Sequence, residues 1–164
     1  MTAANQPPKI PPCPITLFID ADACPVKEEV YKVAQRYGLN TFVVSNAFMA
    51  IPAHPCIERV VVEAGPDVAD DWIAEHATVG DVVITNDIPL AERALAMGAA
   101  AIGANGRSFT RDSIGSAIAQ RAIMEQIRST GAITGGPAPF GKADRSRFLQ
   151  ALDEAINREL RRRR

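Results

Sequence analysis

The chain has 164 residues, of which 47% are apolar, 23% are charged and 5% are aromatic. This length and composition suit one domain with its own core and exclude disordered, fibrous and membrane-spanning proteins. The net charge of −1 is unevenly divided, because residues 15–92 hold 13 acids and 4 bases whereas residues 93–164 hold 6 acids and 13 bases. A basic half of this kind often accompanies nucleic-acid or phosphate binding, although a solvated surface gives the same counts.

The two ends of the chain are expected to lie outside the packed domain. Residues 1–14 contain five prolines and predict a flexible arm, and residues 161–164 are four arginines that predict a basic tail. Residues 15–160 then form one domain. Because there is no apolar signal segment and the three cysteines are widely spaced, we expect a cytoplasmic protein without a disulfide framework or a structural zinc site.

The domain alternates strand-like and helix-like segments. Short apolar runs predict strands, and the expected ranges in chain order are 15–20, 41–45, 57–62, 81–85 and 99–102. Each helix expected in this part starts close to a proline, namely Pro25, Pro66 and Pro89. Apolar strands separated by helices indicate an α/β fold in three layers: a small, mostly parallel sheet of about five strands with helices on both faces.

Beyond the last expected strand the pattern becomes helical. Thr110 is the expected N-cap of a helix whose apolar stripe is Ile114, Ala117, Ile118 and Ala122. A Gly/Pro-rich loop follows at 134–141. The last helix carries apolar residues at spacings of three and four, at Leu149, Leu152, Ile156 and Leu160. These C-terminal helices complete the single domain.

Acidic side chains gather where the expected strands end. Asp20 and Asp22 follow the first strand, and Asp87 follows the fourth. Asp70 and Asp71 lie in the first turn of the helix between the third and fourth strands. Because the carboxyl ends of parallel strands share one edge of a sheet, where ligands bind, we expect these carboxylates to converge there.

Carboxylates crowded at one edge repel one another and favour a bound cation. Hard oxygen ligands select Mg²⁺ or Mn²⁺, which can activate water and stabilise charge on a phosphoryl group. Four of the five acids also have a local interpretation, since Asp87 suits a helix N-cap, Asp22 suits a turn, and the two helical acids suit the positive end of their helix. Asp20 has no evident local role, so the convergence favours a site.

Basic side chains near the C-terminal helices are candidates for contacts with phosphates. They are Arg107, Arg111, Lys142, Arg145 and Arg147. A solvated surface explains them equally well, but arginines beside an acidic edge could hold the flanking backbone of a nucleic acid.

Several long motifs, in the same order, resemble the YaiI/YqxD family of uncharacterised bacterial proteins. The motifs are Asp20-Ala-Asp-Ala-Cys-Pro-Val26, Val44-Ser-Asn46, Gly65-Pro-Asp-Val-Ala-Asp-Asp-Trp-Ile73, Ile84-Thr-Asn-Asp-Ile-Pro-Leu-Ala91 and Gly135-Gly-Pro-Ala-Pro-Phe140. The resemblance covers about residues 15–160. It implies a PIN-like domain, because the family is grouped by similarity with PIN-like nucleases. Those proteins bind Mg²⁺ or Mn²⁺ through clustered acids on a small parallel sheet and hydrolyse RNA or DNA.

The resemblance also implies roles for particular residues. It matches Asp20, Asp87 and one of the two helical acids to the PIN-like acids; with Asp22 added, the expected metal ligands are Asp20, Asp22, Asp70, Asp71 and Asp87. The expected catalytic residues are Asp20, Asp22, Asp71 and Asp87. A fourth PIN-like acid is replaced by Asn105, a weaker ligand. Together with four of the basic side chains named above, the expected substrate-binding residues are Asn46, Asn105, Arg107, Arg111, Arg145 and Arg147.

Three functions stay open at this point. The leading hypothesis is a Mg²⁺/Mn²⁺-dependent nuclease that acts on RNA in preference to DNA. The second is a small-molecule phosphatase in which Asp20 is the nucleophile and Asp22 the general acid, a spacing typical of haloacid-dehalogenase enzymes. The third is a non-catalytic nucleic-acid-binding protein that retains a weak metal site.

Overall fold

The computed structural model describes residues 15–115 and 140–162 of the chain. Its strands are β1 (Thr16–Asp20), β2 (Asn40–Ser45), β3 (Ile57–Val61), β4 (Val82–Ile84) and β5 (Ala100–Ile102). Its helical elements are the 3-10 turn η2 (Ala21–Ala23), α1 (Lys27–Tyr37), α2 (Val68–His76), α3 (Ile88–Ala96) and α5 (Lys142–Arg162). The expected flexible arm, residues 1–14, lies outside the described part.

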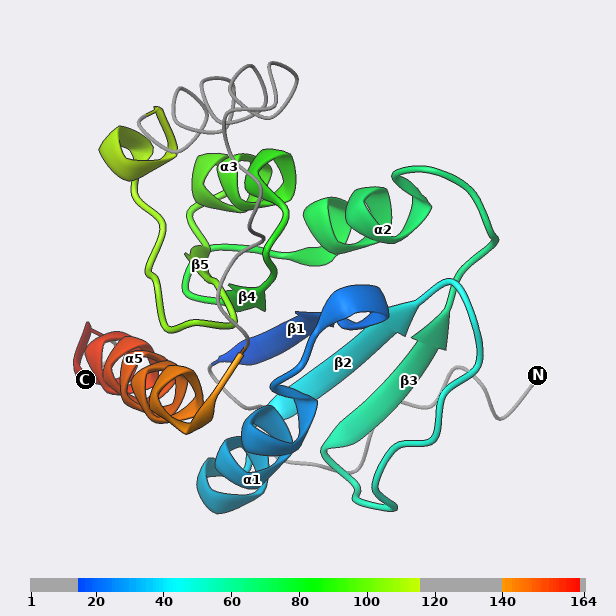
Figure 1. The fold of residues 1–164 in the computed structure, drawn as a ribbon, viewed down its shortest axis with the longest axis horizontal. Coiled ribbons are helices and arrows are strands. Elements are labelled where there is room, and N and C mark those ends of the chain that lie inside the picture. Colours follow the sequence, from blue (N-terminus) through cyan, green and yellow to red (C-terminus); the bar gives the residue numbers. More distant parts are fainter. Residues whose placement is uncertain (1–14, 116–139, 163–164) are drawn as a thin grey trace.

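All five strands are parallel and form one open sheet in the order β3-β2-β1-β4-β5 (Figure 1). The α/β fold expected from the sequence is therefore confirmed. β1 is central because it pairs with β2 on one side and β4 on the other. In consequence the carboxyl ends of β1 and β4 are neighbours, although about 65 residues separate Asp20 from Thr85.

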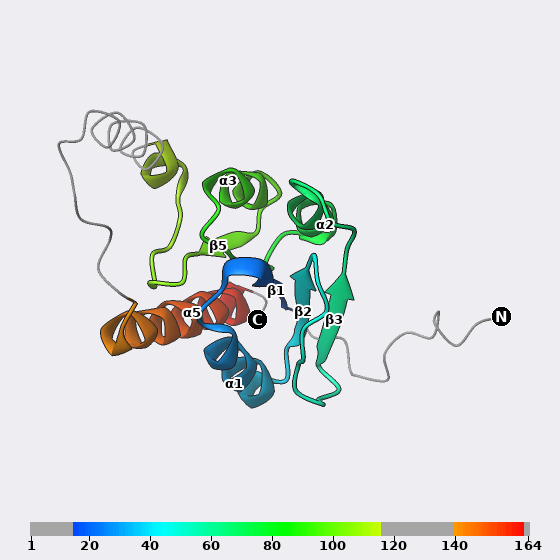
Figure 2. The ribbon, with the colours of Figure 1, turned by 45° about the vertical axis from the view of Figure 1, so that its right-hand side comes forward.

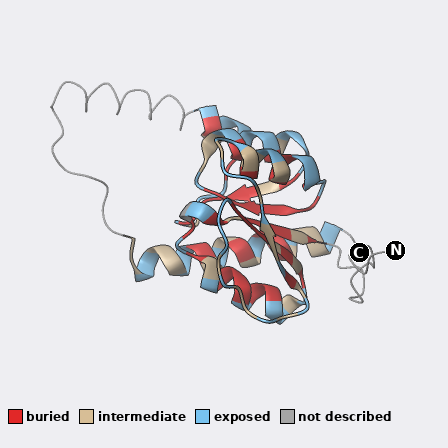
Figure 3. Ribbon diagram, turned by 90° about the vertical axis from the view of Figure 1, so that its right-hand side faces the viewer, coloured by how far each residue is buried: buried red, intermediate tan, exposed pale blue. Residues whose placement is uncertain are grey.

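Two hydrophobic cores cover the two faces of the sheet. On β1, Leu17 and Ile19 enter the core that packs against α1 and α5, whereas Phe18 enters the core beneath α2 and α3. The alternation follows from the pleat, which points successive side chains to opposite faces. The helices occupy opposite sides of the sheet in Figure 2, and Figure 3 shows buried strands between helices whose outer surfaces are exposed.

The first helix begins later than the position of Pro25 predicts. Residues Ala21–Ala23 form a 3-10 turn, and the α-helical segment starts at Lys27. The helix ends as expected at Gly38, which adopts a left-handed conformation with φ of 67° and donates its N–H to Ala34. The additional turn keeps Asp22 at the sheet edge instead of placing it on the helix.

The C-terminal helix is longer than the sequence pattern indicates. α5 continues to Arg162, so Arg161 and Arg162 are helical although they were assigned to a tail. Its inner face buries Phe148, Leu152 and Ile156 against the sheet. None of the described helices is long and apolar enough to cross a membrane.

The segment after β5 also agrees with the sequence where it is described. Thr110 and Ser113 exchange side-chain hydrogen bonds at the start of a helix that includes residues 111–115. Gly106 lies so close to α5 that an added Cβ would stand 2.5 Å from the carbonyl carbon of Arg147. The rest of the predicted stripe, Ala117, Ile118 and Ala122, and most of the loop at 134–141 lie outside the described residues.

A buried carboxylate at the amino end of β4 has a structural role. Asp81 is 7% exposed and accepts hydrogen bonds from the backbone N–H of Thr16 and from both the N–H and the hydroxyl of Thr78. It therefore links the start of β1 to the turn before β4, at the edge of the sheet opposite to the acidic cluster.

We predict that Asp81→Ala lowers the free energy of unfolding by about 2–3 kcal/mol, because two backbone donors lose their acceptor. The measurement is urea denaturation followed by circular dichroism. Glu58→Ala, an exposed acid on edge strand β3, is the matched control and should change stability by no more than about 0.5 kcal/mol. Equal losses in both variants would contradict the structural role of Asp81.

Candidate functional site

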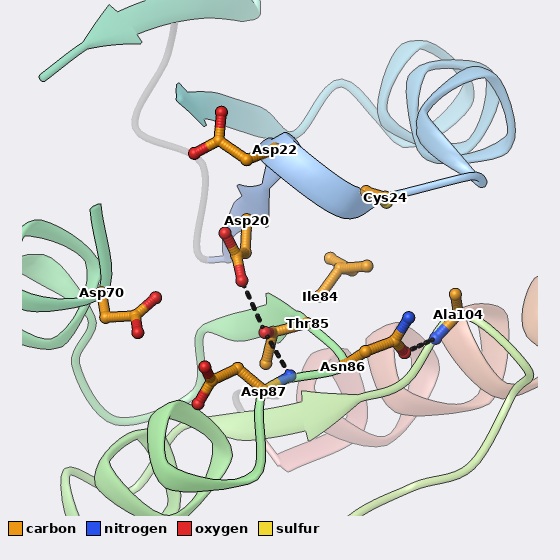
Figure 4. Close-up of a pocket in the computed structure, with 9 residues that line it drawn as sticks. All are labelled: Asp20, Asp22, Cys24, Asp70, Ile84, Thr85, Asn86, Asp87 and Ala104. Atoms are coloured by element: carbon orange, nitrogen blue, oxygen red, sulfur yellow. Dashed lines mark hydrogen bonds between the residues drawn. The ribbon is translucent and has the colours of Figure 1, made fainter. Parts of the chain in front are cut away.

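A pocket of about 370 Å³ opens at the carboxyl edge of the sheet, between β1 and β4 (Figure 4). Four acids from three separate segments surround it, together with smaller polar and apolar groups. The lining residues are Asp20, Asp22, Cys24, Asp70, Ile84, Thr85, Asn86, Asp87 and Ala104. The convergence of acids predicted from strand ends is thus present for Asp20, Asp22, Asp70 and Asp87.

Thr85 connects the carboxyl ends of the two central strands. Its hydroxyl donates to Asp20 Oδ2 at 2.8 Å and accepts the backbone N–H of Asp87 at 2.9 Å. Asp87 is also the N-cap of α3, since its Oδ1 accepts the N–H of Leu90. Asp87 therefore caps a helix and lines the pocket, so its local and functional interpretations are compatible.

Asp22 is held by the neighbouring strand. Both of its carboxylate oxygens lie 3.1 Å from the backbone nitrogen of Asn46, the first residue after β2. Asn46, a predicted substrate-binding residue, contributes this backbone contact, and its side chain is not among the groups that line the pocket. The interaction ties the 3-10 turn to the β2–β3 connection.

The two helical acids have different surroundings. Asp70 faces the pocket in Figure 4. Asp71 points elsewhere and forms a 2.7 Å ion pair with Arg93 of α3, in which both side chains are about half exposed. The structure therefore brings Asp70 to the pocket. Asp71, a predicted catalytic residue, lies outside it. Asp70 and Asp71 are successive residues of α2, so their side chains point about 100° apart around the helix axis.

Burial and mutual repulsion disfavour ionisation of two of these acids. Burial raises the pKa of Asp20, the hydrogen bond from Thr85 opposes this effect, and the charges of Asp87 and Asp22 add to it. Burial also raises the pKa of Asp70 to about 6, with further contributions from Asp87 and Asp20. The acids are therefore close enough to repel one another across the pocket.

Three lining residues with polar side chains, Thr85, Asn86 and Cys24, have no functional role predicted from the sequence. Asn86 accepts the backbone N–H of Ala104 through Oδ1, and Thr85 makes the bridge described above. Both belong to the motif that carries Asp87, and only the pairing of β4 with β1 and β5 shows that they face the pocket. Cys24 is buried, which raises the pKa of its thiol, so it is a packing group with no thiolate character.

Asn105 lies just beyond the lining. Its Oδ1 accepts the N–H of Arg107 in a local turn, and the residue is exposed. A Cβ added at Gly103 would stand 3.2 Å from Asn105 Oδ1 and 3.3 Å from Asn86 Oδ1, so the two amides flank this glycine. Asn105 therefore borders the pocket at the end of β5 without entering it.

The predicted basic contacts are dispersed. Arg145 donates to Glu29 and to the carbonyl of Pro25, and Arg147 pairs with Asp144 at 2.6 Å. Arg111 lines a separate hollow beside α3. Arg107 and Arg111 are exposed, and neither has an ion-pair partner in the described part of the chain. Among the residues that the structure describes, no arginine or lysine lines the acidic pocket.

The pocket presents oxygen ligands without forming a closed cage. Within the described residues, no three acidic, histidine or cysteine side chains stand close enough together to hold one metal ion among themselves. Arrangements of this kind suit ions that retain several water ligands and use one or two protein carboxylates, as Mg²⁺ does.

The comparisons with known proteins agree with the resemblance noted in the sequence. Residues 18–158 match the family model described as "Uncharacterized BCR, YaiI/YqxD family". The chain belongs to the YaiI/YqxD family. A "UPF0178 protein" of Caulobacter sp. (strain K31) is 68% identical over 140 residues, which are 85% of this chain and 93% of that protein.

Two further relatives extend this agreement to other bacteria. "UPF0178 proteins" of Azorhizobium caulinodans and Rhodopseudomonas palustris (strain BisB5) are 58% and 52% identical over 147 and 152 residues, respectively. The matches cover 90% and 93% of this chain and 92% and 93% of those proteins. No solved structure was found to match the chain.

The raised pKa of Asp70 predicts how this carboxylate affects stability. Because the folded-state pKa is about 6 instead of the usual 3.8, the folded state retains a proton that the unfolded chain releases. The free energy of unfolding is therefore highest, as far as Asp70 is concerned, at low pH, and it falls as the pH rises to about 6. Asp70→Asn removes that loss, so we expect the variant to be about 1 kcal/mol more stable at pH 8, after allowance for solvent screening.

Asp71→Asn is the matched control, because it removes a neighbouring charge that is paired with Arg93 at the surface. It should leave stability unchanged or lower it by less than about 1 kcal/mol. Thermal unfolding of both variants at pH 4 and pH 8 checks the prediction. A gain for Asp70→Asn that is equal at both pH values would contradict the assigned cause.

Proposed function

We propose that this protein is a Mg²⁺- or Mn²⁺-dependent phosphodiester hydrolase whose substrate is nucleic acid, RNA in preference to DNA. The observation that supports it best is the convergence of Asp20, Asp22, Asp70 and Asp87, from three segments, on one pocket at the carboxyl edge of a parallel sheet. The resemblance to PIN-like nucleases implies the same role, binding of Mg²⁺ or Mn²⁺, for Asp20, Asp87 and a helical acid.

The carboxylates leave oxygen atoms available for a hard cation. Thr85 occupies only Oδ2 of Asp20, and Leu90 occupies only Oδ1 of Asp87. No hydrogen bond from a described residue reaches the carboxylate of Asp70. Because Asp20 and Asp70 have raised pKa values through burial and repulsion, a divalent cation would relieve the repulsion and favour the ionised acids.

Each pocket residue has a distinct contribution in this proposal. A bound Mg²⁺ or Mn²⁺ supplies a Lewis acid for the phosphoryl group and lowers the pKa of a water molecule. Asp20 and Asp87 are the central ligands, Thr85 orients Asp20, and Asp70 approaches from the opposite wall. Asp22, anchored on Asn46, adds negative charge at the rim and orders the turn between β1 and α1.

The phosphatase alternative has less support. It requires Asp22 to deliver a proton to the leaving group, yet both oxygens of Asp22 face the backbone N–H of Asn46. A cationic partner for a phosphomonoester is also missing, because no lysine or arginine lines the described pocket. The non-catalytic alternative differs from the proposal only in turnover, so an activity assay separates the two.

The direct test is cleavage of a fluorescent single-stranded RNA with Mn²⁺ or Mg²⁺. We expect metal-dependent cleavage that falls about 100-fold or more in Asp20→Asn and in Asp87→Asn. Asp70→Asn should also lose activity, whereas Asp71→Asn, its matched control outside the pocket, should retain it. Full activity in both Asp20→Asn and Asp87→Asn would exclude the proposed site. Turnover of phosphomonoesters without cleavage of RNA or DNA would favour the phosphatase.

Metal binding can be measured without turnover. At a Mn²⁺ concentration 100 times the dissociation constant, we expect the free energy of unfolding to rise by about 2.7 kcal/mol. Asp20→Asn and Asp87→Asn should abolish this increase, and Asp71→Asn should preserve it. The measurement is thermal unfolding in a Mn²⁺ titration, and an equal increase in all four proteins would place the ion elsewhere.

A further inference from the structure

An aromatic side chain on the β2–β3 connection is exposed and supported by an arginine. Phe48 is 72% exposed, the largest value among the exposed large apolar residues of the described chain. The guanidinium carbon of Arg59, on β3, stands 3.8 Å from the centroid of its ring. Arg59 also donates to the carbonyl of Met49 at 3.2 Å. Arg59 therefore covers one face of the ring, and the exposure leaves the other face open.

The positive charge of Arg59 is not neutralised. No carboxylate in the described part of the chain lies within ion-pair distance of its guanidinium. Residues 15–92 contain only 4 basic side chains against 13 acidic ones, so an unpaired arginine beneath an exposed ring is unusual in this half. An aromatic face with an adjacent cation suits a flat ligand that carries negative charge.

The Phe48–Arg59 pair is connected to the acidic pocket through a short segment. Asn46, whose N–H holds Asp22, precedes Phe48 by two residues, which span at most about 7 Å. In the sheet register Ser45, at the end of β2, is opposite Val61, which is 50% exposed on the edge strand. β2 ends beside the turn that carries Asp22, and Arg59 is two residues from the end of the neighbouring strand β3, so the pair lies on the same side of the sheet as the Asn46–Asp22 contact.

We propose that Phe48 and Arg59 form a stacking platform for an unpaired base, and that the substrate of the acidic pocket is therefore single-stranded nucleic acid. The base stacks on the open face of the Phe48 ring. The Arg59 guanidinium covers the opposite face of the ring and attracts the phosphates. A duplex holds its bases inside the helix and cannot use this contact except at its ends. The proposal rests on the nuclease function above, because that function supplies the strand.

The test measures binding in the Asp20→Asn/Asp87→Asn background, in which turnover is removed and repulsion of the strand is reduced. Fluorescence anisotropy with an octanucleotide should show about tenfold weaker binding, or more, for Phe48→Leu, whereas Phe48→Tyr retains affinity. Arg59→Gln should weaken binding and Arg59→Lys should weaken it less. Met97→Ala, which removes another exposed apolar side chain, is the matched control and should have no effect.

The ligands in the assay separate stacking from general charge attraction. Matched RNA and DNA strands should both respond to Phe48→Leu. Abasic strands should bind weakly and show no response, and blunt duplexes, which offer only their terminal base pairs, should respond much less than single strands. In addition, the oligonucleotide should quench the tryptophan fluorescence of Phe48→Trp. It should quench the fluorescence of the parent, whose single tryptophan is Trp72, less. Unchanged affinity in Phe48→Leu would overturn the proposal. So would a change in self-association without a change in binding, because Phe48 would then contact protein.

These outcomes are distinct from failure of the proposed hydrolysis. If Phe48→Leu weakens binding but the wild type cleaves nothing, the platform stands and the nuclease proposal fails. If the wild type cleaves single strands and Phe48→Leu leaves binding and KM unchanged, the nuclease proposal stands and the platform is wrong. A thermal unfolding curve that matches the parent shows that Phe48→Leu remains folded.

Discussion

The parallel pairing of β1 with β4 holds carboxylates together that repel one another. Asp20 ends one strand, Asp87 follows the other, and the Thr85 hydroxyl lies between them as donor to the first and acceptor for the second. Two cores on opposite faces of the sheet hold the strands in this register. Because the backbone is fixed by packing on both sides, the acids cannot relax away from each other as they would on a flexible loop.

This arrangement lowers the stability of the fold at the acidic pocket. Burial and mutual repulsion raise the pKa values of Asp20 and Asp70, so ionisation at neutral pH opposes folding. Asp81 shows the contrast, since this buried acid at the other end of the sheet accepts hydrogen bonds from three donors and links the start of β1 to the turn before β4. Acids gathered in a pocket, two of them with raised pKa values, are typical of sites that bind a cation or a proton.

Some residues of the candidate site could be predicted from the sequence because each directly follows a segment whose apolar pattern predicts a strand. Asp20, Asp22 and Asp87 follow apolar runs, and parallel strands bring their ends to one edge. Asp70 and Asp71 could not be separated in this way, since both suit the first turn of a helix and only the orientation of α2 against the sheet selects Asp70. Thr85 likewise lies in the motif Ile84–Ala91, but the sequence alone does not show what its hydroxyl contacts.

The sequence by itself determined the α/β class, the strands and the acidic strand ends, because local apolar periodicity and turn residues act over a few positions. Tertiary structure decided which side chains share a pocket. Arg145 is a predicted substrate contact, but the packing of α5 directs it to Glu29 and to the carbonyl of Pro25. The position of Phe48 over Arg59 also depends on how the β2–β3 connection folds back along the edge strand. Such contacts join residues far apart in the chain, so no local pattern specifies them.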